Sequence, residues 1–134
     1  MNRTQILEKP EALLITMSKE NVVEWGGLEL IDRFFQFNYR DGSDETFWYK
    51  IGSNLPKFEV MFVYIVIHNT IRWRFNFVGY EQFPRNGPGI TLWKNGIGHR
   101  YWGNFVVLCG PSIKMPEELT RRGFQGFRYS EILF

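Results

Sequence analysis

Residues 60–77 read VMFVYIVIHNTIRWRFNF, and this stretch decides the fold. Its first part, residues 60–67, is a continuous apolar and β-branched run, which is typical of a strand covered on both faces. Its second part, from Ile71 to Phe77, alternates large apolar side chains with Arg72 and Arg74, so one face of a strand is apolar and the other polar. The residues between the two parts are turn formers. The stretch therefore predicts a β-hairpin.

The residues before this hairpin predict a strand and then a short helix. Residues 12–17 form an apolar run of strand length. Ser18 can cap a helix that extends to residue 24 or 25, because its hydroxyl can accept a hydrogen bond from a first-turn amide. Gly26-Gly27 ends the helix.

Residues 28–39 fit two interpretations. Some of their apolar positions fit a helix, but every second residue from 35 to 39 is aromatic, as in a strand. Residues 41–44, Asp-Gly-Ser-Asp, are a strong turn signal, and the apolar alternation resumes over residues 47–51. We therefore expect a hairpin across this turn, with a helix over residues 28–39 as the open alternative.

The second half of the chain predicts further strands. Residues 83–98 are rich in Gly and Pro and predict a long surface loop, broken by a short strand at 90–93. Loops of this length are often functional. Residues 101–108 predict another strand, ended by Gly110-Pro111. Beyond it we expect a short helical turn near residues 116–118 and a basic, aromatic tail.

The composition suits one β-rich domain. The chain has 134 residues, of which 44% are hydrophobic, with 13 Phe, 6 Tyr and 5 Trp. Aromatic and β-branched residues favour sheet, and this length supports one core. We expect a single domain over residues 1–134 with a loose lead-in at 1–10. Its fold class is mainly β with short helices (α+β), built as a small, partly open β-barrel.

The charge distribution and the single cysteine narrow the class of partner and the cellular compartment that we expect. Residues 1–60 hold 7 Lys/Arg and 10 Asp/Glu, whereas residues 61–134 hold 9 and 4. A basic second half favours an anionic partner, although the same charges suit an ordinary solvated surface. Cys109 is the only cysteine and lies in an apolar run, which favours a buried thiol in a reducing, cytoplasmic setting. The apolar runs are too short for a signal peptide or a membrane span.

No standard catalytic or metal-binding pattern is present. His68 lies in a turn, and His99 lies beside a glycine loop without a Gly-x-Ser-x-Gly elbow. Two isolated histidines and one cysteine offer no spacing for a metal site, and the glycine pairs at 87–89 and 96–98 match no phosphate-binding loop. We therefore expect no metal and no cofactor, and the balance is against enzymatic activity.

Basic residues interleaved with aromatic rings are the remaining functional pattern. Cations contact phosphates, and exposed rings stack on unpaired bases. Nearby glycines let a polymer backbone approach closely, although arginine stems also cover apolar cores. The candidate nucleic-acid-binding residues are Arg72, Arg74, Arg85, Lys94, His99, Arg100, Trp102, Arg121, Arg122 and Arg128.

Three stretches carry a resemblance to a known superfamily. They are FNFVGYE (residues 75–81), YWGNFVVLCGP (101–111) and RGFQGFRY (122–129). Their layout over residues 55–134 resembles the PUA-like superfamily, above all its ASCH and EVE branches. The resemblance implies a pseudobarrel with a basic cleft, and RNA binding or recognition of a modified base in an aromatic-lined pocket. Some ASCH-like proteins are hydrolases, so the resemblance leaves an enzymatic role open.

Three functional hypotheses follow. The first is binding of RNA, or of single-stranded or modified nucleic acid. It predicts that Arg72, Arg74, Arg100 and the tail arginines share one surface with an exposed ring. The second is a hydrolase for a nucleoside-like small molecule in the same cleft, which needs a buried polar group such as His99 or Glu81. The third is a protein-interaction domain of viral or mobile-element origin, which needs an exposed apolar patch. We expect no membrane partner.

Overall fold

The computed structural model describes residues 12–52, 54–57, 59–94, 96–115 and 127–130, without the side chains of Lys94 and of residues 127–130. The predictions for residues 1–10, 116–118 and 121–126 lie outside these ranges. In chain order the described elements are β1 (Ala12–Thr16), α1 (Lys19–Glu24), α2 (Leu28–Asn38), β2 (Thr46–Ile51), β3 (Phe62–Ile67), β4 (Thr70–Phe83), β5 (Ile90–Lys94), β6 (Ile97–Tyr101), β7 (Gly103–Lys114) and β8 (Phe127–Ser130).

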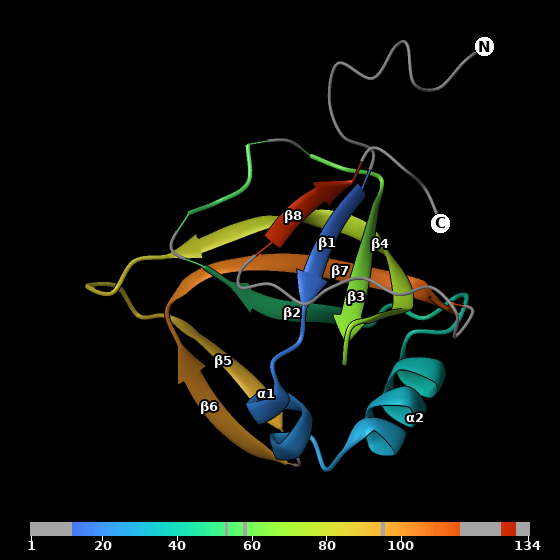
Figure 1. Ribbon diagram of the computed structural model, residues 1–134. Coiled ribbons are helices and arrows are strands. Elements are labelled where there is room, and N and C mark those ends of the chain that lie inside the picture. The colour runs from blue at the N-terminus through green and yellow to red at the C-terminus, as the bar shows by residue number, and fades with distance from the viewer. Residues whose placement is uncertain (1–11, 53, 58, 95, 116–126, 131–134) are drawn as a thin grey trace, which may run out of the picture.

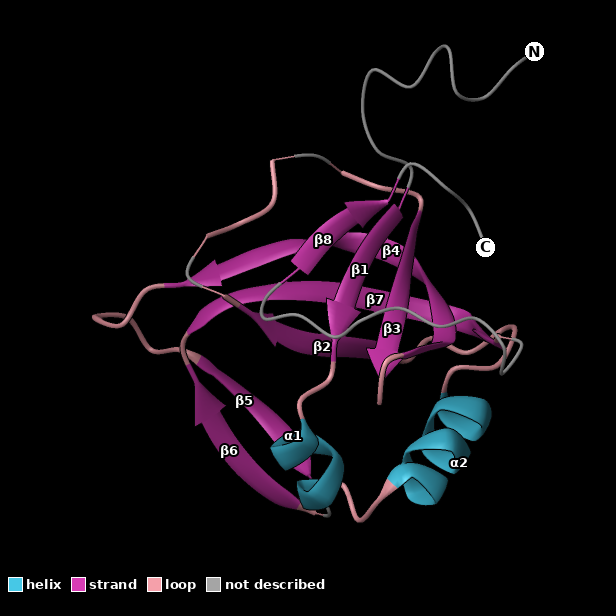
Figure 2. Cartoon of the chain, in the orientation of Figure 1, coloured by secondary structure: helices cyan, strands magenta, loops and turns pink. Residues whose placement is uncertain are grey.

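Most of the described strands form one mixed sheet. Its order is β2-β7-β4-β3-β1-β8, and β5 pairs with β6 in a separate two-stranded ribbon (Figure 1). The β1–β3 pair is parallel, and the other described pairs are antiparallel. The predicted mainly β domain with short helices is confirmed (Figure 2). The sheet is not closed into a barrel, because β2 and β8 are its two edges among the described strands.

The predicted hairpin is β3 and β4. Residues 63–67 are at most 1% exposed, as expected of a strand covered on both faces. His68 and Asn69 have φ angles of 51° and 61°, the left-handed conformation that a tight two-residue turn requires. One residue of the predicted apolar face of β4, Ile71, does not lie on that face. The register shifts between Ile65 and Val66, so Ile71 packs in a smaller cluster, apart from the main core of Trp73 and Phe75.

Helix α1 follows the sequence prediction. The Ser18 hydroxyl accepts a hydrogen bond from the backbone N–H of Asn21 over 3.1 Å. Gly26 and Gly27 have φ angles of 91° and 103°, which end the helix because L side chains rarely adopt them. The cap and the glycine pair together fix where α1 lies between β1 and α2.

Residues 28–38 form α2, so the expected hairpin across residues 41–44 is wrong. Ile31 and Phe35, four residues apart, are fully buried on one side of the helix. Phe37 is 62% exposed, so the aromatic alternation did not mark a strand face. The Ser112 backbone N–H donates to the Tyr39 carbonyl over 2.7 Å, and the Ser112 hydroxyl donates to the Phe35 carbonyl over 2.5 Å. Tertiary contacts therefore decided between the two local interpretations.

Two expectations in the second half need correction. The strand at residues 101–108 was expected to end at Gly110-Pro111, but β7 continues to Lys114. The β4–β7 register shifts between Arg74 and Asn76. Pro111, which has no N–H to donate, therefore lies at this irregularity, where the proline costs no regular inter-strand hydrogen bond. The expected loop over residues 83–98 is shorter, because β5 pairs with β6 from Ile97 onward.

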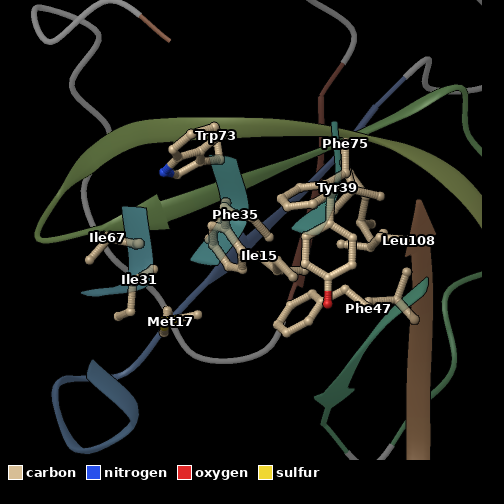
Figure 3. Close-up of a cluster of buried hydrophobic side chains, with 14 of the residues drawn as sticks. Ile15, Met17, Ile31, Phe35, Tyr39, Phe47, Ile67, Trp73, Phe75 and Leu108 are labelled. Atoms are coloured by element: carbon tan, nitrogen blue, oxygen red, sulfur yellow. The ribbon is translucent and has the colours of Figure 1, made fainter. Parts of the chain in front are cut away.

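The main core is aromatic and lies between the helices and one face of the sheet (Figure 3). Phe35 is fully buried at its centre. Its ring centroid lies 5.0–6.3 Å from those of four other rings, all in edge-on contact: Tyr39, Phe47, Trp73 and Phe75. Such edge-to-face contacts add to the stabilisation that burial itself gives. Much of the unusual aromatic content is therefore structural.

Candidate functional site

A pocket of about 410 Å³ opens along the edge strand β2. Its lining residues come from α1, from β2, from the β5–β6 ribbon and from β7, and the ribbon lies beside α1 in Figure 1. They are Asn21, Glu24, Trp25, Phe47, Trp48, Tyr49, Lys50, Ile51, Leu92, Tyr101 and Phe105. The volume falls within the ordinary range for small-molecule sites.

The pocket wraps around the outer edge of β2. Successive side chains of a strand point to opposite faces, and β2 pairs only on its inner side, with β7, among the described strands. Phe47 and Tyr49 therefore face the helices, whereas Trp48 and Lys50 face the opposite side. All four line the cavity.

Aromatic rings form most of the pocket wall. Trp25 and Phe47 meet in an edge-on contact with their ring centroids 5.9 Å apart. On the other side, Phe105 makes edge-on contacts with Trp48 and with Tyr101, each at 6.4 Å. Rings held by neighbouring rings lose little conformational freedom when a ligand binds, which favours binding of a flat partner.

A hydrogen-bond chain borders the cavity beside α1. The Tyr49 hydroxyl donates to the Thr16 carbonyl over 3.2 Å, and the Asn21 side-chain amide Nδ2 lies 3.3 Å from the same hydroxyl. Burial raises the pKa of Tyr49, against the opposing effect of hydrogen bonds from Asn21 and from the Ser18 backbone. The hydroxyl therefore stays protonated and keeps its donor at neutral pH.

Two charged side chains complete the lining. Glu24 lies on α1, three residues after Asn21 and one before Trp25, so these residues share one side of the helix. Lys50 is exposed on β2 and its stem passes over Gly103, where a Cβ atom would lie 3.0 Å from Lys50 Cε. The pocket lining thus includes one carboxylate and one ammonium group.

Arg72 and Arg74, the first two predicted site residues, do not line the pocket. Arg72 binds the carboxylate of Asp32 on α2, with Nη2 to Oδ2 at 2.6 Å. The guanidinium of Arg74 lies over the Phe62 ring, 4.3 Å from its centroid. Both arginines lie near the β3–β4 turn, whereas the β5–β6 ribbon follows the opposite end of β4.

Arg100 and Trp102 bind the glycine-rich segment of their own chain. Nη1 of Arg100 donates to the Pro88 carbonyl, and Nε1 of Trp102 donates to the Gly87 carbonyl over 2.9 Å. Gly89 has a φ angle of 71°, and a Cβ atom there would lie 2.9 Å from the Trp102 ring. These glycines therefore serve a close contact within the chain, where the sequence suggested close approach of a polymer.

No family model, curated protein or solved structure matches this chain. The candidate site therefore stands on its own geometry.

His99 and Arg85 remain available at the surface. His99 is exposed on β6, pairs in register with the pocket residue Leu92, and has its ring 6.4 Å from that of Tyr101. Arg85 is exposed in the turn before β5. Lys94 lies on β5 and Arg128 on β8, but the structure does not describe their side chains. Arg121 and Arg122 lie outside the described residues. Among the residues whose side chains the structure describes, none of the predicted ones lines this pocket.

The pocket residues of α1 and β2 escaped the sequence prediction. Trp25, Trp48 and Tyr49 lie in the acidic half of the chain, whereas every predicted site residue lies in the basic half. For Trp48 and Tyr49 the local signal was the alternation over residues 47–51, which predicted a strand but not its place at the edge of the sheet. In the described ranges no three His, Cys, Asp or Glu side chains are grouped to hold a metal ion. No helix in those ranges is long and apolar enough to cross a bilayer.

Proposed function

We propose that the protein binds nucleic acid and holds one unpaired or modified base in the aromatic pocket. The observation that carries this proposal is the pocket itself, in which rings from α1, β2, β6 and β7 surround a cavity of about 410 Å³. Every base has a flat π-face, and stacking on aromatic side chains stabilises single-stranded nucleic acid in proteins. The PUA-like layout of the sequence is in keeping with the same function.

Lys50 on the pocket wall, together with polar side chains of the neighbouring ribbon and of the turn before it, can contact the phosphates that flank a bound base. Lys50 lines the cavity, and His99 lies on the ribbon next to Tyr101. Arg85 is exposed in the turn that leads into the same ribbon. Contacts of this kind give affinity without sequence preference and weaken as salt rises.

The described residues give less support to the two alternatives. A hydrolase needs a buried acid or base near the cavity, but His99 and Glu81 are exposed and neither lines it. A protein-binding face needs a contiguous apolar patch. Among the most exposed large apolar side chains, Phe37 on α2 lies on a different element from Trp93 and Ile97, which share the β5–β6 ribbon.

Binding of short fluorescent single-stranded RNA and DNA at two salt concentrations tests the proposal. We expect binding at low salt that weakens as salt rises. Trp48→Ala removes one pocket ring and should weaken binding about tenfold or more. Phe37→Ala removes an exposed ring of α2 and serves as the control, with thermal melts to show that both variants fold. No binding at low salt, or unchanged affinity in a folded Trp48→Ala variant, would contradict the proposal.

A further inference from the structure

We propose that the β5–β6 ribbon carries a second contact surface for single-stranded nucleic acid, on the face that bears Trp93 and Arg100. This inference rests on the proposed function and extends the binding site beyond the pocket. The inner face of the ribbon carries Leu92 and Tyr101, which line the pocket. We call the opposite face the outer face. A bound strand contacts both: one base lies in the pocket, and a further base stacks on Trp93.

The pairing register of the ribbon separates its two faces. Trp93 on β5 lies opposite Gly98 on β6, and Thr91 lies opposite Arg100. Successive side chains of a strand alternate between faces, whereas directly opposite residues share one. Trp93 and Arg100 are therefore diagonal neighbours on the outer face, about 7–8 Å apart. Leu92 points into the pocket that α1 also lines, so the outer face is turned away from the acidic side chains of that helix.

Trp93 presents its ring to solvent. The chain has five tryptophans, all within the described residues, and Trp93 alone is exposed, at 72%. A Cβ atom at Gly98 would lie 3.2 Å from Cη2 of Trp93, so one side of the ring rests on the Gly98 backbone. This contact positions the ring and leaves its other side open. A ring held in this way loses little conformational freedom when a base stacks on it, and every base has a π-face.

Arg100 supplies a positioned cation on the same face. Its Nη1 donates to the Pro88 carbonyl, which holds the guanidinium in place. A guanidinium has five N–H donors, so this bond leaves others for a phosphate. No carboxylate among the described residues forms an ion pair with Arg100. The charge of Arg100 is therefore available to an anion that lies beside Trp93.

The charge of the ribbon favours a polyanion as the partner. Residues 82–102 include no Asp or Glu, and they hold Arg85, Lys94, His99 and Arg100. A cationic surface with an open ring matches single-stranded nucleic acid, which joins phosphates to flat bases. A protein or a lipid surface that docked on Trp93 would use the apolar bulk of the side chain, and the flat face of the ring would not matter. Variants that keep bulk or ring alone separate these partners.

The two faces of the ribbon also set the length of nucleic acid that is required. A strand passes round an edge of the ribbon to reach Trp93 from the pocket, so the shortest fragments occupy the pocket alone. Single-strand sites on small β-domains cover roughly 4–16 nucleotides. We therefore expect Trp93 to contribute to the affinity of an oligonucleotide of about eight nucleotides, and less and less as the oligonucleotide is shortened.

Titration of fluorescent oligouridylate and oligothymidylate, from about two to about eight nucleotides long, tests the inference. Trp93→Ala should weaken binding of the longest oligonucleotide about tenfold, and this effect should shrink with length. Trp93→Tyr keeps a stacking ring and should bind nearly as the wild type does. Trp93→Leu keeps apolar bulk without a ring and should lose as much affinity as Trp93→Ala. Phe37→Ala removes an exposed ring of α2 and is the matched control, with thermal melts of every variant.

The outcomes separate this inference from the proposed function. A folded Trp93→Ala variant with wild-type affinity for the longest oligonucleotide would overturn the second surface and leave the pocket in place. Equal affinities of the Leu and Tyr variants would overturn it as well, and would indicate an apolar partner. A loss in Trp93→Ala that is the same at every length would show that Trp93 acts through the pocket. If the wild type binds no oligonucleotide, the proposed function fails and the inference fails with it.

Discussion

The guanidinium of Arg72 and the carboxylate of Asp32 form a two-pronged ion pair that joins β4 to α2. Nη2 of Arg72 lies 2.6 Å from Oδ2, and Nε lies 3.1 Å from Oδ1. The indole N–H of Trp73 donates to the same carboxylate over 2.7 Å. The side chains of Arg72 and Asp32 are only 18% and 17% exposed. A residue that suggested phosphate binding in the sequence therefore holds a helix to the sheet.

Replacement of Asp32 should destabilise the fold. Asp32→Ala leaves the charge of Arg72 and the N–H of Trp73 without their acceptor in a partly buried setting, so we expect a loss of about 2–4 kcal/mol in the free energy of unfolding. Denaturant unfolding measures this loss. Glu29→Ala breaks an exposed ion pair with Arg33 on the same helix and should cost less than about 0.5 kcal/mol. Equal effects of the two substitutions would contradict the role of Asp32.

The same carboxylate should contribute to acid sensitivity. Burial on its own would raise the pKa of Asp32, but hydrogen bonds from Arg72 and Trp73 and the charges of Arg72 and Lys114 outweigh it and lower the pKa below 3.8. A pKa that is lower in the folded state gives stability above the unfolded pKa of about 3.9, and this stability is lost as pH falls through the folded pKa. Unfolding measured from neutral pH to about pH 2 should therefore show a shallower acid decline in Asp32→Asn than in the wild type.

The local sequence pattern was enough to predict the elements whose ends are marked by turn, cap or glycine residues. The β3–β4 hairpin and α1 have explicit turn, cap and glycine signals, and both are present. Residues 28–39 contain no such signal, and their apolar spacing fits both a helix and a strand. The choice of helix depends on Ile31 and Phe35 packing into a core contributed by distant strands, and on Ser112 binding the end of the helix. These long-range contacts have no local trace in the sequence.

Gly110 allows α2 to end against β7, and its replacement should be costly. A Cβ atom at this position would lie 2.1 Å from the Tyr39 carbonyl oxygen, closer than any side chain can approach a backbone atom without movement. We expect Gly110→Ala to lower the free energy of unfolding by about 1–3 kcal/mol. Gly79→Ala is the matched control, because Gly79 also lies in a strand and a Cβ atom there meets nothing within 4 Å. Thermal melts that show no difference between the two would contradict this close contact.

Tyr39 should make the protein sensitive to alkali. Burial, aided by the nearby charge of Glu45, raises the pKa of this core tyrosine far above its ordinary value of 10.0. For a pKa that is higher in the folded state, stability is complete below the unfolded pKa of about 10 and is lost as pH rises above it, by up to about 1.4 kcal/mol per pH unit. Tyr39→Phe removes the ionising group. Its free energy of unfolding should therefore fall less steeply above pH 10 than that of the wild type.

The candidate site was harder to predict than the fold because charge in the sequence does not show which charges are already paired. Arg72 and Arg100 are engaged within the chain, by Asp32 and by the Pro88 carbonyl. Trp48 and Tyr49 lie in the acidic half of the chain, where the net charge does not favour an anionic partner. Their shared pocket exists because β2 is an edge strand, and strand order is a property of the whole sheet.

Lys50 is the pocket cation whose removal should separate phosphate contact from base stacking. It is exposed on β2 beside the rings, so a nucleic-acid backbone that enters the pocket passes close to it. Each phosphate contact on a single strand contributes about 0.7 to the slope of log affinity against log salt. Lys50→Gln should therefore reduce this slope by about that amount and weaken binding most at low salt. Lys19→Gln neutralises an exposed lysine of α1 outside the pocket and should change the slope much less. Because Lys50→Gln leaves Trp48 and Tyr101 in place, quenching of tryptophan fluorescence at saturation should stay the same, and a loss of quenching in the folded variant would show that Lys50 acts on the pocket itself.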